Sequence, residues 1–200
     1  MKFQTIRRAL MGLASVTALV VMTGCAHQVS MSPELKQLPA VASKIDKNVA
    51  YVISAADLAK EVQTPGGGGD KIKYQPYRDL DGALYKAFSE VFKDVTKLSS
   101  TAEAPALASK GVTLVIEPAI TTTSSSESMF TWPPTQFSVE LVCKVSDLQG
   151  KAITEVRAMG KGAATFDEFK SDFSLAARRA SKEAVDNLVK VLSETAELRR

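Results

Sequence analysis

The sequence has few of the residues on which many enzymes and metalloproteins depend. Its 200 residues include one histidine, one tryptophan and two cysteines. A structural zinc site takes four Cys or His ligands, and the single histidine, His27, lies far along the chain from Cys143. We therefore expect no metal site, no catalytic residue and no dissociable cofactor, and we predict that the protein is not an enzyme.

The sequence also lacks an excess of positive or negative charge when the amino-terminal segment is left out of the count. The whole chain has 25 Lys and Arg against 22 Asp and Glu. Residues 1–24 hold three of the bases and none of the acids, which leaves 22 of each in the remainder. This balance does not favour binding to nucleic acid, and we expect no nucleic-acid partner.

The amino-terminal segment has the pattern of an export signal. Lys2, Arg7 and Arg8 precede a mostly apolar run from Ala9 to Met22. This run is shorter than the roughly 20 apolar residues that span a membrane, and it fits a cleaved signal peptide. It leads into Val21-Met22-Thr23-Gly24-Cys25, which resembles the lipobox of bacterial lipoproteins.

The resemblance to a lipobox implies cleavage before Cys25 and covalent diacylglycerol and N-acyl lipid on that residue. Several acyl chains hold a protein on a membrane, because each buried CH₂ contributes about 0.8 kcal/mol. Ala26 comes next, which by the sorting rule of enteric bacteria implies the periplasmic face of the outer membrane. The expected parts are a signal peptide (1–24), a lipidated flexible tether (25–47) and a single periplasmic α+β domain (48–200).

Apolar and polar residues alternate strictly over most of 137–146, which predicts a half-buried antiparallel strand there. The turn after it, at 147–150, ends in Gly150. Residues 152–164 should form the next strand, with a bulge at Gly160 or Gly162. Further strands are expected at 49–53, 71–74 and 112–123.

Apolar residues at steps of three and four predict helices over 79–98, with Asp79 as N-cap, and over 171–198. Residues 99–110 are expected to be a linker. The predicted fold class is α+β, in the order β-α-β-β-β-α. We expect a mainly antiparallel sheet with the two helices packed on one face.

The stretch Tyr74-Gln75-Pro76-Tyr77-Arg78-Asp79-Leu80 leads into the first predicted helix. Together with the lipobox and the order of elements, it resembles the YajG-type family of uncharacterised bacterial lipoproteins. The same order resembles the amino-terminal domain of TolB and the lipopolysaccharide-assembly lipoprotein LptE. The resemblance implies a periplasmic, non-enzymatic protein that acts through partners. The long Thr- and Ser-rich hairpin and the glycine loop depart from the family pattern, so the partner is not implied.

A cluster of interface-type side chains lies between two strands that should form a hairpin: Met129, Phe130, Trp132 and Pro133. Aromatic residues are frequent anchors of protein interfaces, and Trp also favours a membrane surface. We take these four residues as candidate partner contacts. The alternative is that they fold back over the open edge of the sheet.

A cluster of bases, Arg178, Arg179 and Lys182, lies in the last predicted helix. These side chains would suit an anionic partner such as a lipid head group, although a solvated helix face accounts for them as well. Cys143 lies on the apolar face of a strand and is expected to be a small buried hydrophobe rather than a reactive thiol.

The leading hypothesis is a membrane-anchored, non-catalytic accessory or scaffold for an envelope assembly or transport complex, with another envelope protein as its partner. The alternative is a carrier or sensor lipoprotein that binds a lipid or a glycan. That alternative requires a pocket between the helices and the sheet, near Phe88, Phe92 and Phe137.

Overall fold

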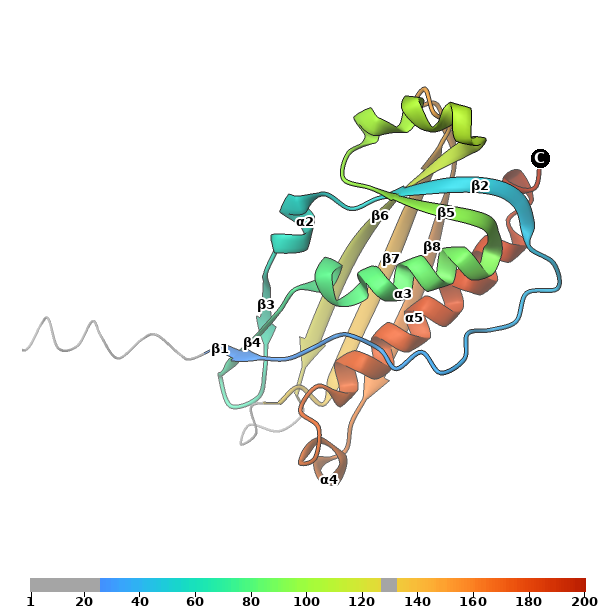
Figure 1. Cartoon of the computed structure of the whole chain (residues 1–200). Helices are drawn as coiled ribbons and strands as arrows, with labels where there is room; N and C mark the ends of the chain where they lie inside the picture. Colours follow the sequence, from blue (N-terminus) through green and yellow to red (C-terminus); the bar gives the residue numbers. More distant parts are fainter. Residues whose placement is uncertain (1–25, 127–132) are drawn as a thin grey trace, which may run out of the picture.

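The computed structural model describes residues 26–126 and 133–200 (Figure 1). Its centre is a five-stranded sheet in the order β5-β2-β6-β7-β8, and helices α3 (Pro76–Val91) and α5 (Leu175–Glu194) pack on one face of it. The strands are β2 (Ile45–Val52), β5 (Phe92–Leu98), β6 (Val112–Ser125), β7 (Gln136–Ser146) and β8 (Ala152–Ala163).

The predicted α+β class is confirmed, but the sheet is mixed rather than mainly antiparallel. β2 pairs in parallel with both β5 and β6, whereas β6, β7 and β8 form an antiparallel meander. The parallel half arises because α3 and the 3₁₀ helix η2 (Thr101–Lys110) serve as crossover connections. Residues 99–110, predicted as a linker, therefore mostly form η2.

A second sheet of three strands lies on the helix side of the first. Its order is β1-β4-β3, from Ala26–Gln28, Lys71–Tyr74 and Val62–Pro65. Tyr74 joins it to the large sheet: its ring lies edge-on to Phe137 with centroids 5.3 Å apart, and its hydroxyl lies 2.6 Å from Thr122 Oγ1. Phe137 belongs to the core under the helices, so the small sheet lies on that side.

The segment predicted as a flexible tether is built into the fold instead. β1 pairs with β4, Val29 and Met31 are 3% and 0% exposed, and the Met31 N–H donates to the carboxylate of Asp79 at 2.7 Å. Further along, the Lys44 ammonium donates to the Ser89 carbonyl of α3 at 2.6 Å. The segment is mostly irregular and contributes single side chains to the core. It therefore lacks the hydrophobic periodicity from which a buried element can be predicted.

The helix predicted over 79–98 is two elements. α3 starts at Pro76, a residue suited to the first helical turn because its missing N–H is not needed there. It ends at Val91, and β5 follows directly. Asp79 is therefore not the N-cap but lies in the first turn of α3. Val95 and Leu98 fit the spacing of a helix and of a strand, and pairing with β2 decides for the strand.

The last helix, predicted over 171–198, starts later and is followed by a separate turn: α5 begins at Leu175, and the 3₁₀ turn η3 (Ala196–Leu198) follows it. A short helix, α4 (Phe166–Phe169), comes before the predicted range. A one-turn helix, α2 (Ala55–Ala59), lies between β2 and β3. The tight turn predicted at 147–150 is confirmed, with Gly150 at φ 82°.

Helix α5 packs directly on the backbone of β8. A Cβ added at Gly160 would lie 2.1 Å from the carbonyl oxygen of Ala180, and one added at Gly162 would lie 2.0 Å from that of Ala176. The helix side of this contact is also small, since α5 presents alanine at every fourth position, at 176, 180 and 184. The bulge predicted at these glycines is absent, because the β7–β8 register runs without a shift from Gln136 to Val145.

We predict that Gly160→Ala lowers the free energy of unfolding by about 1–3 kcal/mol, because overpacking forces α5 away from the sheet. Gly82→Ala is the matched control. A Cβ at Gly82 of α3 meets nothing within 4 Å, so this variant should gain about 0.5–1 kcal/mol from helix propensity. Urea unfolding measures both, and equal midpoints would contradict the close approach.

Candidate binding surface

The face of the sheet opposite the helices is open over β6, β7 and β8. Its outward side chains are mixed in character: Glu117, Ala119, Thr121 and Thr123 on β6, Ser138, Glu140, Val142 and Lys144 on β7, and Glu155, Arg157, Met159 and Lys161 on β8. The register aligns them in rows across the three strands, one of which is Glu117, Lys144 and Glu155. We call this surface the open face.

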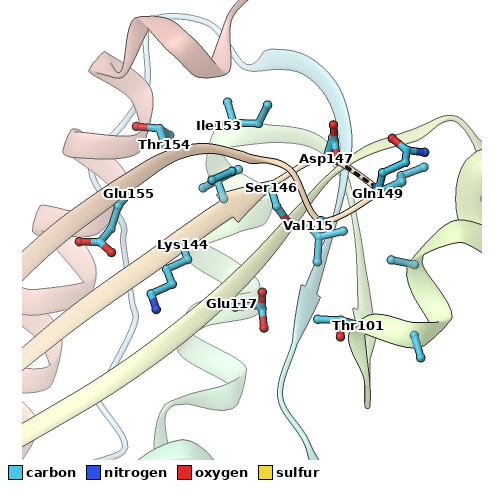
Figure 2. Close-up of a pocket in the computed structure, with 16 residues that line it drawn as sticks. Thr101, Val115, Glu117, Lys144, Ser146, Asp147, Gln149, Ile153, Thr154 and Glu155 are labelled. Atoms are coloured by element: carbon cyan, nitrogen blue, oxygen red, sulfur yellow. Dashed lines mark hydrogen bonds between the residues drawn. The ribbon is translucent and has the colours of Figure 1, made fainter.

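A cleft of about 780 Å³ lies at one end of the open face, between η2 and the β7–β8 turn (Figure 2). Apolar side chains line it from both walls, including Ala104, Val115, Leu148 and Ile153. Its polar lining includes Thr101, Glu117, Lys144, Gln149 and Glu155. A volume in this range is typical of small-molecule sites, and the lining of this cleft is divided about equally between apolar and polar residues.

Both walls of the cleft are held in place by local structure. A small second core fixes η2 on the sheet through Ala50, Leu98, Ala104, Leu107, Val112 and Val115. In the β7–β8 turn, Asp147 Oδ1 accepts hydrogen bonds from the N–H groups of Gln149 and Lys151, both at 2.9 Å (Figure 2). The cleft is therefore preformed by the fold.

The charges around the cleft differ in their pairing. On β8, Arg157 donates to Glu155 at 2.7 Å and reaches Glu140 on β7 at 3.4 Å. Lys144 forms no ion pair within the described residues. Glu117 and Glu155 flank it in the same cross-strand row, so the charged lining of the cleft is acidic on balance.

The strongly shifted buried groups have structural roles. Burial raises the pKa of Cys143 to about 12, and this thiol is 0% exposed, so the prediction of a small buried hydrophobe is confirmed. Burial, followed by the hydrogen bond to Asp81 at 3.0 Å, raises the pKa of Tyr51. Burial likewise raises the pKa of Asp79, which holds the amino-terminal segment.

Within residues 26–126 and 133–200, no three His, Cys, Asp or Glu side chains come together as a metal site would require. Over the same residues, no helix has both the length and the hydropathy for a membrane crossing.

Most of the predicted contact residues in the hairpin lie outside the described residues, as does Cys25. This holds for Met129, Phe130 and Trp132, which stay predictions. Pro133 is described and is buried beside the buried Pro134, so it does not present a surface to a partner.

The three bases of the last predicted helix come together around a hollow of about 200 Å³ on α5. Each is paired with a carboxylate of the same chain: Arg178 with Asp172, Arg179 with Glu168 at 2.7 Å, and Lys182 with Asp186 at 2.6 Å. An anionic ligand would have to compete with these carboxylates, and the anionic contact stays a prediction.

The pocket that the carrier hypothesis placed between helices and sheet is filled by side chains. Phe88, Phe92 and Phe137 are 0%, 0% and 3% exposed and belong to one continuous core. The cleft lies on the opposite face. The sequence does not predict this cleft, because one of its walls is η2, whose small residues and proline are typical of a linker.

No family model and no curated protein matches the chain. Three solved structures illustrate what it is similar to. A Xanthomonas campestris protein described by the family model DUF330 is 12% identical, over 84% of this chain and 93% of that chain, with a TM-score of 0.45. A Helicobacter pylori protein described as a neuraminyllactose-binding hemagglutinin homologue is 13% identical, over 86% and 94%, with a TM-score of 0.45.

The third structure is a Caulobacter crescentus protein described as a lipoprotein, 10% identical over 73% of this chain and 92% of that chain, with a TM-score of 0.29. At identities and TM-scores this low, the likeness assigns neither a family nor an activity. The resemblance to the YajG-type family, TolB and LptE stays a prediction.

The ion pair of Arg179 with Glu168 generates a pH-dependent prediction. Hydrogen bonds from Arg179, and then from the N–H and hydroxyl of Thr165, lower the pKa of Glu168 from 4.5 to about 2. A carboxyl whose pKa is lowered by folding stabilises the fold above its unfolded pKa and loses that contribution on acidification. Stability should therefore fall between pH 4.5 and about 2.

Glu168→Gln should flatten this part of the stability profile, measured by urea unfolding across that pH window. The matched control is Asp167→Asn, in the same turn, whose carboxylate is exposed and, among the described residues, pairs with Lys170. An unchanged profile in Glu168→Gln would contradict the assignment of the shift to this pair.

Proposed function

We propose that the protein is a lipid-anchored, non-catalytic accessory protein of the bacterial envelope, located on the periplasmic face of the outer membrane. In this proposal Cys25 carries the acyl chains and the open face binds another envelope protein. The observation that supports it most is the position of the amino-terminal segment relative to the open face.

The described part of the structure starts directly after the lipobox-like motif. β1 begins at Ala26, and Cα atoms of consecutive residues are about 3.8 Å apart, so acyl chains on Cys25 would be attached at the edge of the small sheet. That sheet lies on the helix side of the large sheet, through the contact of Tyr74 with Phe137. In this proposal the anchor and the open face lie on opposite sides of the large sheet.

In this proposal the arrangement orients the domain relative to the membrane without a flexible linker. Acyl chains inserted into a bilayer would bring the helix layer towards the membrane and turn the open face towards the periplasm. The open face combines charged, hydroxyl and apolar side chains, including Met159 at 53% exposure. Such a mixed composition is usual for interfaces between proteins that also exist apart.

A second candidate function is the binding of a small ligand, and the cleft favours it. Its volume of about 780 Å³ and its mixed lining of apolar and polar residues would suit part of a lipid or of a glycan. Lys144 and the neighbouring carboxylates of Glu117 and Glu155 would hydrogen-bond to polar groups of that ligand.

One crosslinking experiment in intact cells tests the anchor side and the partner side together. A photoreactive amino acid replaces Thr121, at the centre of the open face, or Lys86, exposed on α3. We expect protein adducts from position 121 and lipid adducts from position 86. A small-molecule adduct from a third position, Gln149 in the lining of the cleft, would favour the second candidate.

The control is the Cys25→Ser variant, which should leave the membrane fraction and lose the lipid adducts at position 86. Lipid adducts at position 121 without any at position 86 would contradict the proposed orientation. A Cys25→Ser chain that still fractionates with membranes would contradict the anchor.

A further inference from the structure

β8 is an edge strand of the large sheet, and α5 covers one part of that edge. Three side chains of α5 at four-residue spacing bond to its outward backbone groups. Asn187 donates to the Met159 carbonyl at 2.8 Å, and Arg179 donates to the Ala163 carbonyl at 2.8 Å. Between them, the Glu183 carboxylate accepts from the Lys161 N–H at 2.6 Å. The edge from residue 159 to residue 163 is therefore closed to another strand.

The earlier part of the same edge is open. The register with β7 directs the backbone groups of every second β8 residue outwards, and before Met159 these include Glu155 and Arg157. Within the described residues, nothing bonds to the backbone N–H or carbonyl of either residue. A row of unpaired backbone groups on an edge strand is a template for a further strand.

We propose that a second copy of this chain occupies the open edge, with the two β8 strands antiparallel about a two-fold axis at Val156. In this register Glu155 lies opposite Arg157 of the second copy, and Arg157 lies opposite its Glu155. The backbone N–H and carbonyl of each residue then bond to those of its opposite residue, as in any antiparallel pair. Both charge pairs are attractive, and Arg157 would share them with its pairs to Glu155 and Glu140 of its own chain.

Two exposed apolar residues lie on either side of this charged centre. Ile153 and Met159 are among the few large apolar side chains that are exposed in the described residues, at 38% and 53%. Ile153 lies where the β7–β8 register shifts, and the closed part of the edge starts at Met159, so these two residues border the proposed pairing. An axis at Glu155 or at Arg157 would instead place like charges opposite each other, so the side chains select the axis at Val156.

A two-fold axis perpendicular to the sheet keeps both helix layers on the same side. Both copies would then have their amino-terminal segments on one side and their open faces on the other, joined into one continuous surface. The contact is short, which corresponds to a weak interface. Confinement of both copies to one membrane would raise their effective concentration.

The test is the dimer dissociation constant of the full chain, measured by sedimentation over a range of concentrations. Glu155→Arg and Arg157→Glu each place like charges opposite each other twice per dimer, so each should weaken the dimer about tenfold. The double variant Glu155→Arg/Arg157→Glu restores the opposite pairs and should recover the dimer.

Glu117→Arg is the matched control, since it makes the same charge change on β6, two strands away from the edge. It should leave the dissociation constant unchanged. A chain that stays monomeric at all concentrations would overturn the proposal. So would a dimer that neither single reversal weakens, or a double variant that is folded by circular dichroism yet does not recover the dimer.

Discussion

The direct contact of helix α5 with the backbone of β8 determines which part of the β8 edge is covered and which part stays exposed. Gly160 and Gly162 leave no room for a side chain between strand and helix, and the helix meets them with alanines. Because the helix is this close, polar side chains on its flank reach the edge of β8 and bond to it. The same contact therefore packs the core and closes part of an edge that would otherwise recruit other strands.

The amino-terminal segment divides the molecule into two sides. It enters through β1, buries Val29 and Met31, and is held by the carboxylate of Asp79, all on the side of the helices. The other side of the large sheet has a different character, with a polar open face and a cleft whose walls are η2 and the β7–β8 turn. Lipid attached before β1 would separate a membrane side from a binding side.

The sequence predicts best those parts of the fold where the spacing of apolar residues is compatible with only one type of secondary structure. The alternation in β7 can only be a half-buried strand, and β6 and β8 follow from the turn and the register around it. The segment 92–98 is different, since Val95 and Leu98 suit helix and strand alike, and only pairing with β2 distinguishes them. The glycines in β8 predict a bulge from sequence alone. Their actual role, the close approach of α5, is a tertiary contact that no local pattern records.

The candidate surface was less predictable than the fold. The cleft combines η2 with a turn some 45 residues further along the chain, and neither segment has the residues that mark a site. Conversely, the bases on α5 looked free in the sequence, but the fold supplies a carboxylate for each of them. Composition identifies charged residues, whereas their availability depends on neighbours that only the tertiary structure brings near.

The division of the β8 edge by α5 is tested most directly by residue-resolved amide hydrogen exchange of the dilute chain. The Lys161 amide, bonded to Glu183, should exchange slowly, together with the amides of β8 that bond to β7. The amides of Glu155 and Arg157 should exchange much faster and slow down as the protein concentration rises. Slow exchange at Glu155 and Arg157 under all conditions, or fast exchange at Lys161, would contradict a helix that closes one half of the edge and leaves the other open.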